Sequence, residues 1–397
     1  MKSTVAAIDF GTCKIVTLIA ETFGSQRCDI IGAGFAQYNG FMDGKWVYEK
    51  TLNEDIQKSI SEAETQAKRK IKTVNVGVPG EFTRVYATEV SVSIQGADPR
   101  VGPKHVERIF AEAEEQLKPV RGVVIHRAPA WFMVDGGKKN LEPVGMKGTE
   151  LRAMISYVVA DQFFLDDVLR RMRELNINVT SFFSSCIGEA MFYLLEEDRD
   201  RTAMLIDVGY LCTDIMAVEG DAIVFQKTIP VGGGHITADV AEGLDIPLES
   251  AEDIKRNYVY GITESTQEYT VSGEDAVKTL TFKQEEVAAV LEPRVDEIAQ
   301  LISEAIEESG IKLGNWSSYY LTGGGIAPNR GGREYLSARL DKPVRDTVKR
   351  TIKLSSPIYA SAMGLMNLII DTIDSQNRSN QRVSGGIRDF FRTLLGG

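Results

Sequence analysis

The stretch VAAIDFGTCKIVTLIAE at residues 5–21 and the stretch AMLIDVGYLCTDIMAVE at residues 203–219 decide the fold of this 397-residue chain. Each consists of an apolar run, a turn that contains Asp-x-Gly, and a second run rich in Ile, Val and Leu, which is the pattern of two strands joined by a short turn. Asp9 in the first stretch matches Asp207 in the second. Two similar hairpins in the two halves of one chain predict two related domains that face each other across a cleft.

The turns of the two hairpins carry residue types that suit a nucleotide. Glycine lets backbone N–H groups come close to phosphate oxygens, because it has no side chain and tolerates a positive φ. Magnesium prefers carboxylate and water oxygens, so we expect Asp9 and Asp207 to hold a hydrated ion from opposite sides. Thr12 offers a hydroxyl, Lys14 a positive charge, and Thr213 follows the second turn. One Asp-x-Gly is most often an ordinary tight turn, but two at matching positions favour a nucleotide site.

Two further segments are candidates for the nucleoside side of the same site. The sequence LTGGG at residues 321–325 places three glycines after a predicted strand, which lets the backbone pass a purine or phosphate at close range. Glu252 and Lys255 are three residues apart and share one face of a predicted helix, either as a surface ion pair or as a pair that binds a ribose. The sequence has no GxxxxGK[ST] and no GxGxxG in a βαβ unit, so P-loop and Rossmann sites are excluded.

Hydrophobic periodicity predicts the remaining elements. Residues 84–162 are expected to form a small α+β insertion, with strands at 85–95, 122–136 and 151–159 and a helix at 105–117. Outside it, helices are expected at 53–70, 236–244, 248–256, 286–308 and 357–373, and strands at 73–79, at 279–282 and from 317.

Together these segments resemble a known superfamily. The order DFGTCK, DVGYLCTD, PVGGGHITADVA, SAEDIK, LTGGG and PIYASAMGL is similar to that of actin, Hsp70 and the sugar kinases. VDGGKKNLEPVGMKGTELRAMI at residues 134–155 is similar to the inserted subdomain of the FtsA family of bacterial cell-division proteins. The resemblance spans about residues 6–368. It implies an α/β, actin-like two-lobed ATPase fold with an FtsA-type α+β insertion and a C-terminal amphipathic helix.

The resemblance also divides the chain. It implies a first lobe core at residues 1–83, completed by 163–202 and 357–373, and an inserted subdomain at 84–162. The second lobe would comprise a core at 203–232 and 311–356 and a smaller subdomain at 233–310, followed by a flexible linker at 374–386 and a membrane-targeting helix at 387–397.

By the same resemblance the chain binds ATP and Mg²⁺, with Asp9 and Asp207 at the reaction centre. The residues expected to contact the phosphates are Asp9, Gly11, Thr12, Cys13, Lys14, Asp207, Gly209, Tyr210 and Thr213. Those expected to hold the adenosine are Gly233, Glu252, Lys255, Gly323, Gly324 and Gly325. Two features depart from the family: Tyr210 and Leu211 stand where glycine is usual, and SSCIGEAM at 184–191 lacks the expected Glu-Pro. We therefore expect ATP binding, with weak or absent hydrolysis.

The last residues, GGIRDFFRTLLGG, predict a short amphipathic helix. Its apolar residues follow helical spacing and form one stripe along the helix. Two arginines flank this stripe, and their long side chains can reach anionic lipid headgroups. The stripe and its flanks are Ile387, Arg388, Phe390, Phe391, Arg392, Leu394 and Leu395. One copy would bind a membrane weakly and several copies on a filament strongly. The alternative is that the tail docks on protein.

Composition excludes several classes of protein. A formal net charge of −11 argues against nucleic acid, which needs clustered Lys and Arg. The four cysteines lack metal-binding or CxxC spacing, the N-terminus lacks the pattern of a signal peptide, and no apolar run approaches the roughly 20 residues that cross a bilayer. We expect a cytoplasmic protein, peripheral on the inner face of the cell membrane.

Three functions fit these patterns to different degrees. The resemblance implies a self-assembling protein that tethers the division protein FtsZ to the membrane at the division site, and that receives FtsZ's C-terminal peptide on residues 233–310. Within EPRVDEI at 292–298, Arg294 is the residue we expect to contact this peptide, although a solvated helix face would also explain it. The alternatives are a PilM-like pilus-assembly scaffold, which should lack the amphipathic tail, and a small-molecule kinase, which needs a carboxylate base that no motif indicates.

Overall fold

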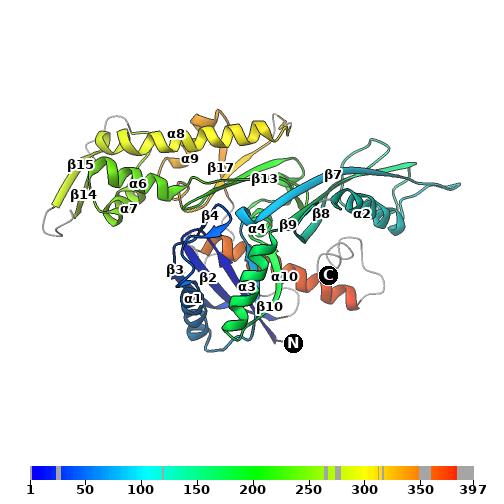
Figure 1. Ribbon diagram of the computed structural model, residues 1–397. Helices are drawn as coiled ribbons and strands as arrows, with labels where there is room; N and C mark the ends of the chain where they lie inside the picture. Colours follow the sequence, from blue (N-terminus) through cyan, green and yellow to red (C-terminus); the bar gives the residue numbers. More distant parts are fainter. Residues whose placement is uncertain are drawn as a thin grey trace.

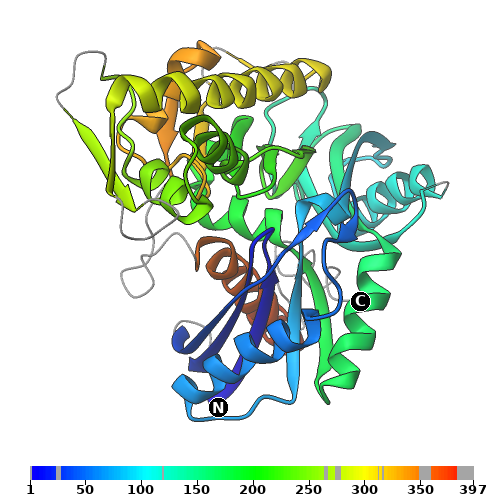
Figure 2. The same cartoon turned by 60° about the vertical axis from the view of Figure 1, so that its left-hand side comes forward.

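The computed structural model describes residues 2–23, 28–118, 120–262, 267–272, 279–311, 313–314, 317–347 and 359–381. In these ranges the strands form two five-stranded sheets, one three-stranded sheet and two short hairpins. Figure 1 shows the first lobe below, the second lobe above it, and an insertion that extends to the right of the second lobe. In the turned view of Figure 2 the two lobes again lie one above the other.

The first lobe is built on a sheet with the strand order β10-β6-β1-β2-β3. Its strands are β1 (Lys2–Phe10), β2 (Lys14–Phe23), β3 (Cys28–Gln37), β6 (Thr73–Val78) and β10 (Asn178–Ser184). Helices α1 (Leu52–Ala67) and α3 (Gln162–Glu174) pack on one face, and α4 (Ser185–Tyr193) and α10 (Ala360–Gln381) pack on the other. Since both faces are covered, β1 needs apolar side chains on both sides, which explains the unbroken run VAAI at residues 5–8.

The second lobe repeats this arrangement in the order β13-β12-β11-β16-β17. Its strands are β11 (Ala203–Val208), β12 (Thr213–Glu219), β13 (Ala222–Ile229), β16 (Tyr319–Thr322) and β17 (Val344–Asp346). In both sheets the strand before the Asp-x-Gly turn pairs antiparallel with the next strand and parallel with a later one. The internal repeat predicted from the sequence is therefore confirmed at the level of topology.

In the described part of the second lobe, four helices and a hairpin accompany the sheet. They are α6 (Gly233–Leu244), α7 (Leu248–Asn257), α8 (Gln284–Glu308), α9 (Gly332–Leu340), β14 (Glu268–Ser272) and β15 (Thr279–Lys283). Their apolar sides share one core with the sheet. Figure 1 shows the β14–β15 hairpin at the end of this lobe that lies away from the insertion.

The insertion leaves the first lobe after β6 and returns to it at α3. It consists of β7 (Thr83–Ser93), α2 (Pro103–Leu117), β8 (Val123–Val134) and β9 (Glu150–Ala160), with the sheet order β7-β9-β8. It has its own apolar core between α2 and the sheet. Strands β7 and β8 lie against β13 of the second lobe, so the insertion contacts both lobes.

Most of the predicted elements are confirmed to within a few residues, but the last helix is longer than expected. Helix α10 continues to Gln381, so residues 374–381 are helical and the prediction of a flexible linker is wrong for them. The polar composition of DSQNRSNQ suggested a linker, yet it contains no glycine or proline that would end a helix already anchored by buried Leu365 and Ile369. The predicted tail helix at 387–397 lies outside the described residues.

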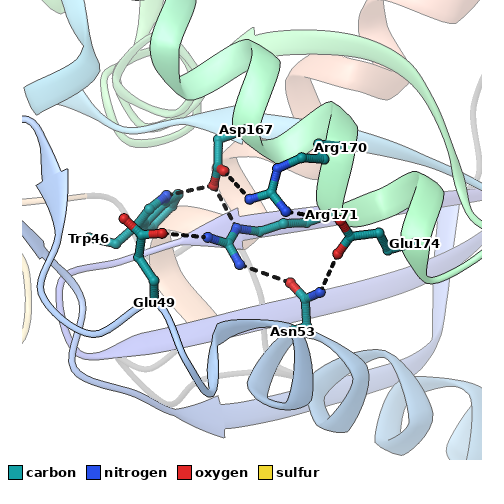
Figure 3. A network of polar contacts seen from close by, with 7 residues as sticks. All are labelled: Trp46, Glu49, Asn53, Asp167, Arg170, Arg171 and Glu174. Carbon is teal, nitrogen blue, oxygen red and sulfur yellow. Dashed lines mark hydrogen bonds and ion pairs between the residues drawn. The ribbon is translucent and has the colours of Figure 1, made fainter.

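A polar network fixes α3 to the segment that precedes α1 (Figure 3). Arg171, with 5% of its side chain exposed, donates through Nε to Asp167 at 2.6 Å. Its other nitrogens donate to Asn53 at 3.0 Å and to Glu49 at 3.5 Å. Trp46 donates to the same Asp167 oxygen at 2.8 Å. The buried guanidinium thus joins the long loop before α1 to the helix that follows the insertion.

Two short hairpin strands and one 3₁₀ turn complete the first lobe beside this network. They are β4 (Phe41–Met42), β5 (Lys45–Trp46) and η2 (Gly80–Phe82). The N–H of Gly44 donates to the Glu81 carboxylate at 2.6 Å, so the hairpin rests on the turn that leads into the insertion.

Candidate nucleotide site between the two lobes

The two Asp-x-Gly turns lie against each other between the lobes. The turn after β1 and the turn after β11 are joined by a hydrogen bond from the N–H of Leu211 to Thr12 Oγ1, at 3.0 Å. Each turn is closed by its own backbone: Gly11 N–H donates to the carbonyl of Lys14, and Gly209 N–H to that of Cys212. The structure therefore brings the two predicted phosphate-binding turns together, one from each lobe.

Three carboxyl groups gather beneath these turns. Asp9 and Glu189 are buried, and Asp207 stands at the end of β11. Burial raises the pKa of Asp9 and of Asp207 above the usual range, while the Lys14 ammonium acts in the opposite direction on both. Burial, followed by the negative charge of Asp207, holds the pKa of Glu189 well above its usual range. Ser185 at the start of α4 hydrogen-bonds Asp9 Oδ1 at 2.8 Å.

The carboxyl groups of Asp9 and Asp207 were predicted to hold a hydrated magnesium ion, and the partners of their oxygens bear on whether they suit one. Asp207 Oδ1 is buried, and the described residues offer it no hydrogen-bond partner. A buried carboxylate oxygen without a partner is costly, and a hydrated cation would satisfy it. Within the described ranges, no three His, Cys, Asp or Glu side chains are placed to ligate a metal directly. The donor set of Asp9 and Asp207 is compatible with a magnesium ion held through its water molecules, and this site stays a prediction.

Glu189 is a site residue that the sequence reasoning missed. It lies on α4, whose neighbouring residues Cys186, Ile187 and Ala190 are buried and apolar. A single acid inside an otherwise apolar helix is a signal, because a buried carboxyl group needs a partner. The sequence at 184–191 departs from the family pattern, but the partner of Glu189 is Asp207 on strand β11, and this pairing could not be predicted from the sequence.

Asp214, which follows the second turn on β12, is a fourth acid at this junction. Burial is the main reason why its pKa rises to about 7, although Thr228 hydrogen-bonds its carboxylate. The first lobe approaches it closely, because a Cβ built on Gly80 would lie 2.1 Å from Asp214 Oδ1. A carboxyl group with a pKa near neutrality can accept or release a proton at physiological pH.

In the predicted nucleoside pair Lys255 is buried and Glu252 is partly exposed, and both already form hydrogen bonds within the chain. Lys255 has 2% of its side chain exposed and donates through Nζ to Glu252 at 2.7 Å and to the Gly233 carbonyl at 3.1 Å. Burial lowers the pKa of Lys255, and Glu252 opposes this effect. Glu252 also accepts hydrogen bonds from Thr237 and from Arg256. The interpretation of a surface ion pair is therefore wrong: this pair joins α7 to the start of α6 inside the lobe.

The three glycines of LTGGG lie beside the second turn. Gly323 has φ +89°, and a Cβ there would lie 2.1 Å from Asp207 Oδ1. Gly325 donates its N–H to the Val208 carbonyl at 2.8 Å. In contrast, a Cβ on Gly324 would meet no described atom within 4 Å. Two of the glycines are therefore needed for close packing against β11, and the third borders open space.

The remaining predicted residues fall in different places. Cys13 lies in the first turn, and burial raises the pKa of its thiol. Thr213 Oγ1 donates to the Val231 carbonyl, so it holds the second turn to the segment before α6. Arg294 on α8 donates from two nitrogens to Asp239 on α6, at 2.6 and 3.0 Å. The tail residues from Ile387 to Leu395 lie outside the described ranges.

Two family models match this chain. The model described as "Cell division protein FtsA" matches residues 204–364, and the model described as "SHS2 domain inserted in FTSA" matches residues 80–159. The chain belongs to the FtsA family. The second match covers the structural insertion between β6 and α3, and the two matches together include the second hairpin, α7 and the LTGGG loop.

Curated FtsA proteins are similar to this chain over most of its length. The FtsA of Pseudomonas aeruginosa is 26% identical over 91% of this chain and 88% of its own length. The FtsA of Bacillus subtilis is 24% identical over 94% and 84%, and that of Escherichia coli K12 is 22% identical over 99% and 97%. This similarity supports a role in cell division and does not favour the PilM-like alternative.

Solved structures establish the fold. A PilM chain of the PilM–PilN type IV pilus biogenesis complex superimposes with a TM-score of 0.60 at 18% identity, covering 92% of this chain and 98% of that one. MreB5 of Spiroplasma citri bound to ADP gives 0.53 at 15% identity, covering 95% and 98%. At these identities the likeness concerns architecture alone. The protein has the predicted actin-like two-lobed fold, with the FtsA-type insertion.

Proposed function

We propose that this protein is an actin-like ATP-binding cell-division protein that polymerises on the inner face of the cell membrane and anchors FtsZ filaments there. Membership of the FtsA family supports the division role. The observation that carries the nucleotide part is the contact between Thr12 and Leu211, which brings two glycine turns together beside buried Asp9 and partly buried Asp207.

This arrangement can hold phosphate and a hydrated cation at one point. The turns supply backbone N–H groups, Lys14 supplies a positive charge, and the two aspartates would orient the water molecules around Mg²⁺. The ion would supply charge neutralisation for the phosphates. Since Tyr210 and Leu211 fill the turn that is glycine-rich in the family, we propose that hydrolysis is slow compared with binding.

Membrane attachment is proposed for the tail. In the described part of the chain, no helix is long and apolar enough to cross a bilayer. Attachment would instead use the apolar stripe at residues 387–395 with Arg388 and Arg392 beside it. Because the stripe is short, firm binding would need several copies on one filament, which couples polymerisation to membrane attachment.

Co-sedimentation with anionic liposomes tests this proposal. The intact chain is compared with one ending at Gly386, each with and without Mg-ATP. We expect Mg-ATP to increase pelleting of the intact chain and the truncated chain to stay in the supernatant. Two full-length variants provide a matched comparison. Phe390→Glu, which puts a charge into the apolar stripe, should abolish pelleting, whereas the control Asp389→Asn should pellet like the wild type. Pelleting that survives truncation, or that the intact chain never shows, would refute membrane attachment by the tail.

The FtsZ contact is proposed for the subdomain at 233–310, around residues 292–298 of α8. Binding of a synthetic FtsZ C-terminal peptide, followed by fluorescence anisotropy, tests it. Arg294→Glu should abolish binding, whereas Arg333→Glu on α9 should leave it unchanged. Since Arg294 also holds Asp239, the thermal midpoint of each variant is measured alongside. Equal binding by both variants would exclude Arg294 from the contact.

A further inference from the structure

The side chain of Tyr210 extends from the second turn onto the nucleoside side of the site. A Cβ built on Gly234 would lie 2.8 to 3.0 Å from three atoms of the Tyr210 ring, so the ring packs directly on the first turn of α6. Lys255 Nζ lies 5.7 Å from the centre of the same ring. The turn is held in this position because Gly233 and Gly234 donate their N–H groups to the carbonyls of Gly209 and Tyr210, at 2.9 and 2.7 Å.

The ring also faces the other groups expected around a nucleoside. Burial raises the pKa of the Tyr210 hydroxyl, and the negative charge of Glu252 on α7 acts in the same direction. Among the described residues, Glu252 and Lys255 form hydrogen bonds with Thr237, Arg256, Gly233 and each other. Since the ring centre lies 5.7 Å from Lys255 Nζ, a ribose that bonded to this ammonium would compete with the ring for the space beside it.

We propose that Tyr210 is a gate on the nucleoside subsite, and that a nucleotide binds only when the Tyr210 ring swings away from Gly234 and Lys255. The inference rests on the proposed nucleotide binding and adds the residue that limits it. In this chain the apparent affinity for nucleotide is reduced by the fraction of molecules in which the ring is closed.

The size of the effect follows from what holds the ring in place. The closed position combines packing against Gly234 with a cation–π contact to a buried ammonium, which together favour the closed state by about tenfold. Removing the ring should therefore tighten nucleotide binding by about tenfold. The gain should appear in the association rate, because free sites no longer have to open first.

The test measures binding of Mg-ATP to the full-length protein by calorimetry, and the association rate with a fluorescent ATP analogue. Tyr210→Ala should bind about tenfold more tightly and associate faster. Tyr210→Phe should behave like the wild type, since the ring and not the hydroxyl blocks the site. Leu211→Ala is the matched control, because it removes a bulky side chain from the same turn and leaves the amide that bonds Thr12.

The outcomes separate the gate from the proposed function. If the wild type binds Mg-ATP and Tyr210→Ala binds equally or more weakly, the gate is refuted and nucleotide binding stands. If neither the wild type nor Tyr210→Ala binds Mg-ATP, and the variant has the same thermal midpoint as the wild type, nucleotide binding is refuted and the gate with it. A gain that Leu211→Ala shows equally would also overturn the gate, because it would trace the effect to the turn as a whole.

Discussion

Replacing Arg171 by methionine should destabilise the first lobe strongly, because it removes the centre of the network in Figure 3. Removing one partner of a buried ion pair costs about 3–5 kcal/mol. The cost should fall near 3 kcal/mol, since Asp167 keeps its hydrogen bonds from Trp46 and Arg170. Arg171→Lys should recover only part of the loss, because an ammonium cannot reach Asp167, Asn53 and Glu49 together.

Arg170 provides the matched control on the same helix. It also pairs with Asp167, but 51% of its side chain is exposed. Exposed pairs contribute about 0–1 kcal/mol, so Arg170→Met should be nearly neutral. Urea unfolding at pH 7 measures both variants, by circular dichroism and by the fluorescence of Trp46, which is itself part of the network. If Arg171→Met loses no more stability than Arg170→Met, the reasoning from burial is wrong.

Three other predictions concern the site and the core. Asp214 has a folded pKa of about 7 against an ordinary 3.8, so the stability it contributes is present below pH 3.8 and is lost as the pH rises through 7. Asp214→Asn should therefore flatten the dependence of the free energy of unfolding on pH, and at pH 8 it should raise that free energy by up to about 4 kcal/mol. An unchanged pH profile would contradict the raised pKa of Asp214. Gly34→Ala should cost about 1–3 kcal/mol in urea unfolding, because its Cβ would lie 1.9 Å from a backbone oxygen of α1, whereas Gly324→Ala should be neutral; equal losses would exclude the close approach as the cause. Lys255→Met should weaken Mg-ATP binding at least about tenfold in calorimetry, whereas Arg256→Met, at an exposed position, should not; equal affinities would remove Lys255 from the site.

The sequence by itself determined the repeated hairpins, the insertion and most helices. These follow from patterns within one segment: alternation or continuous apolar runs in strands, and a 3.6-residue period in helices. The matching of Asp9 with Asp207 was likewise visible in the sequence, because both lobes carry the same strand-turn-strand unit. The similar hairpins occupy matching positions in the two five-stranded sheets.

The tertiary structure decided which polar groups lie beside one another. Glu189 meets Asp207, Lys255 is enclosed by Glu252 and Gly233, and Arg171 joins elements on both sides of the insertion. It also decided the length of α10, whose polar end continues a helix anchored by buried residues upstream. None of these features can be predicted from the pattern of one segment alone. A buried charge is stable only beside a suitable partner, and the partner is brought there by packing between segments that are distant in the chain.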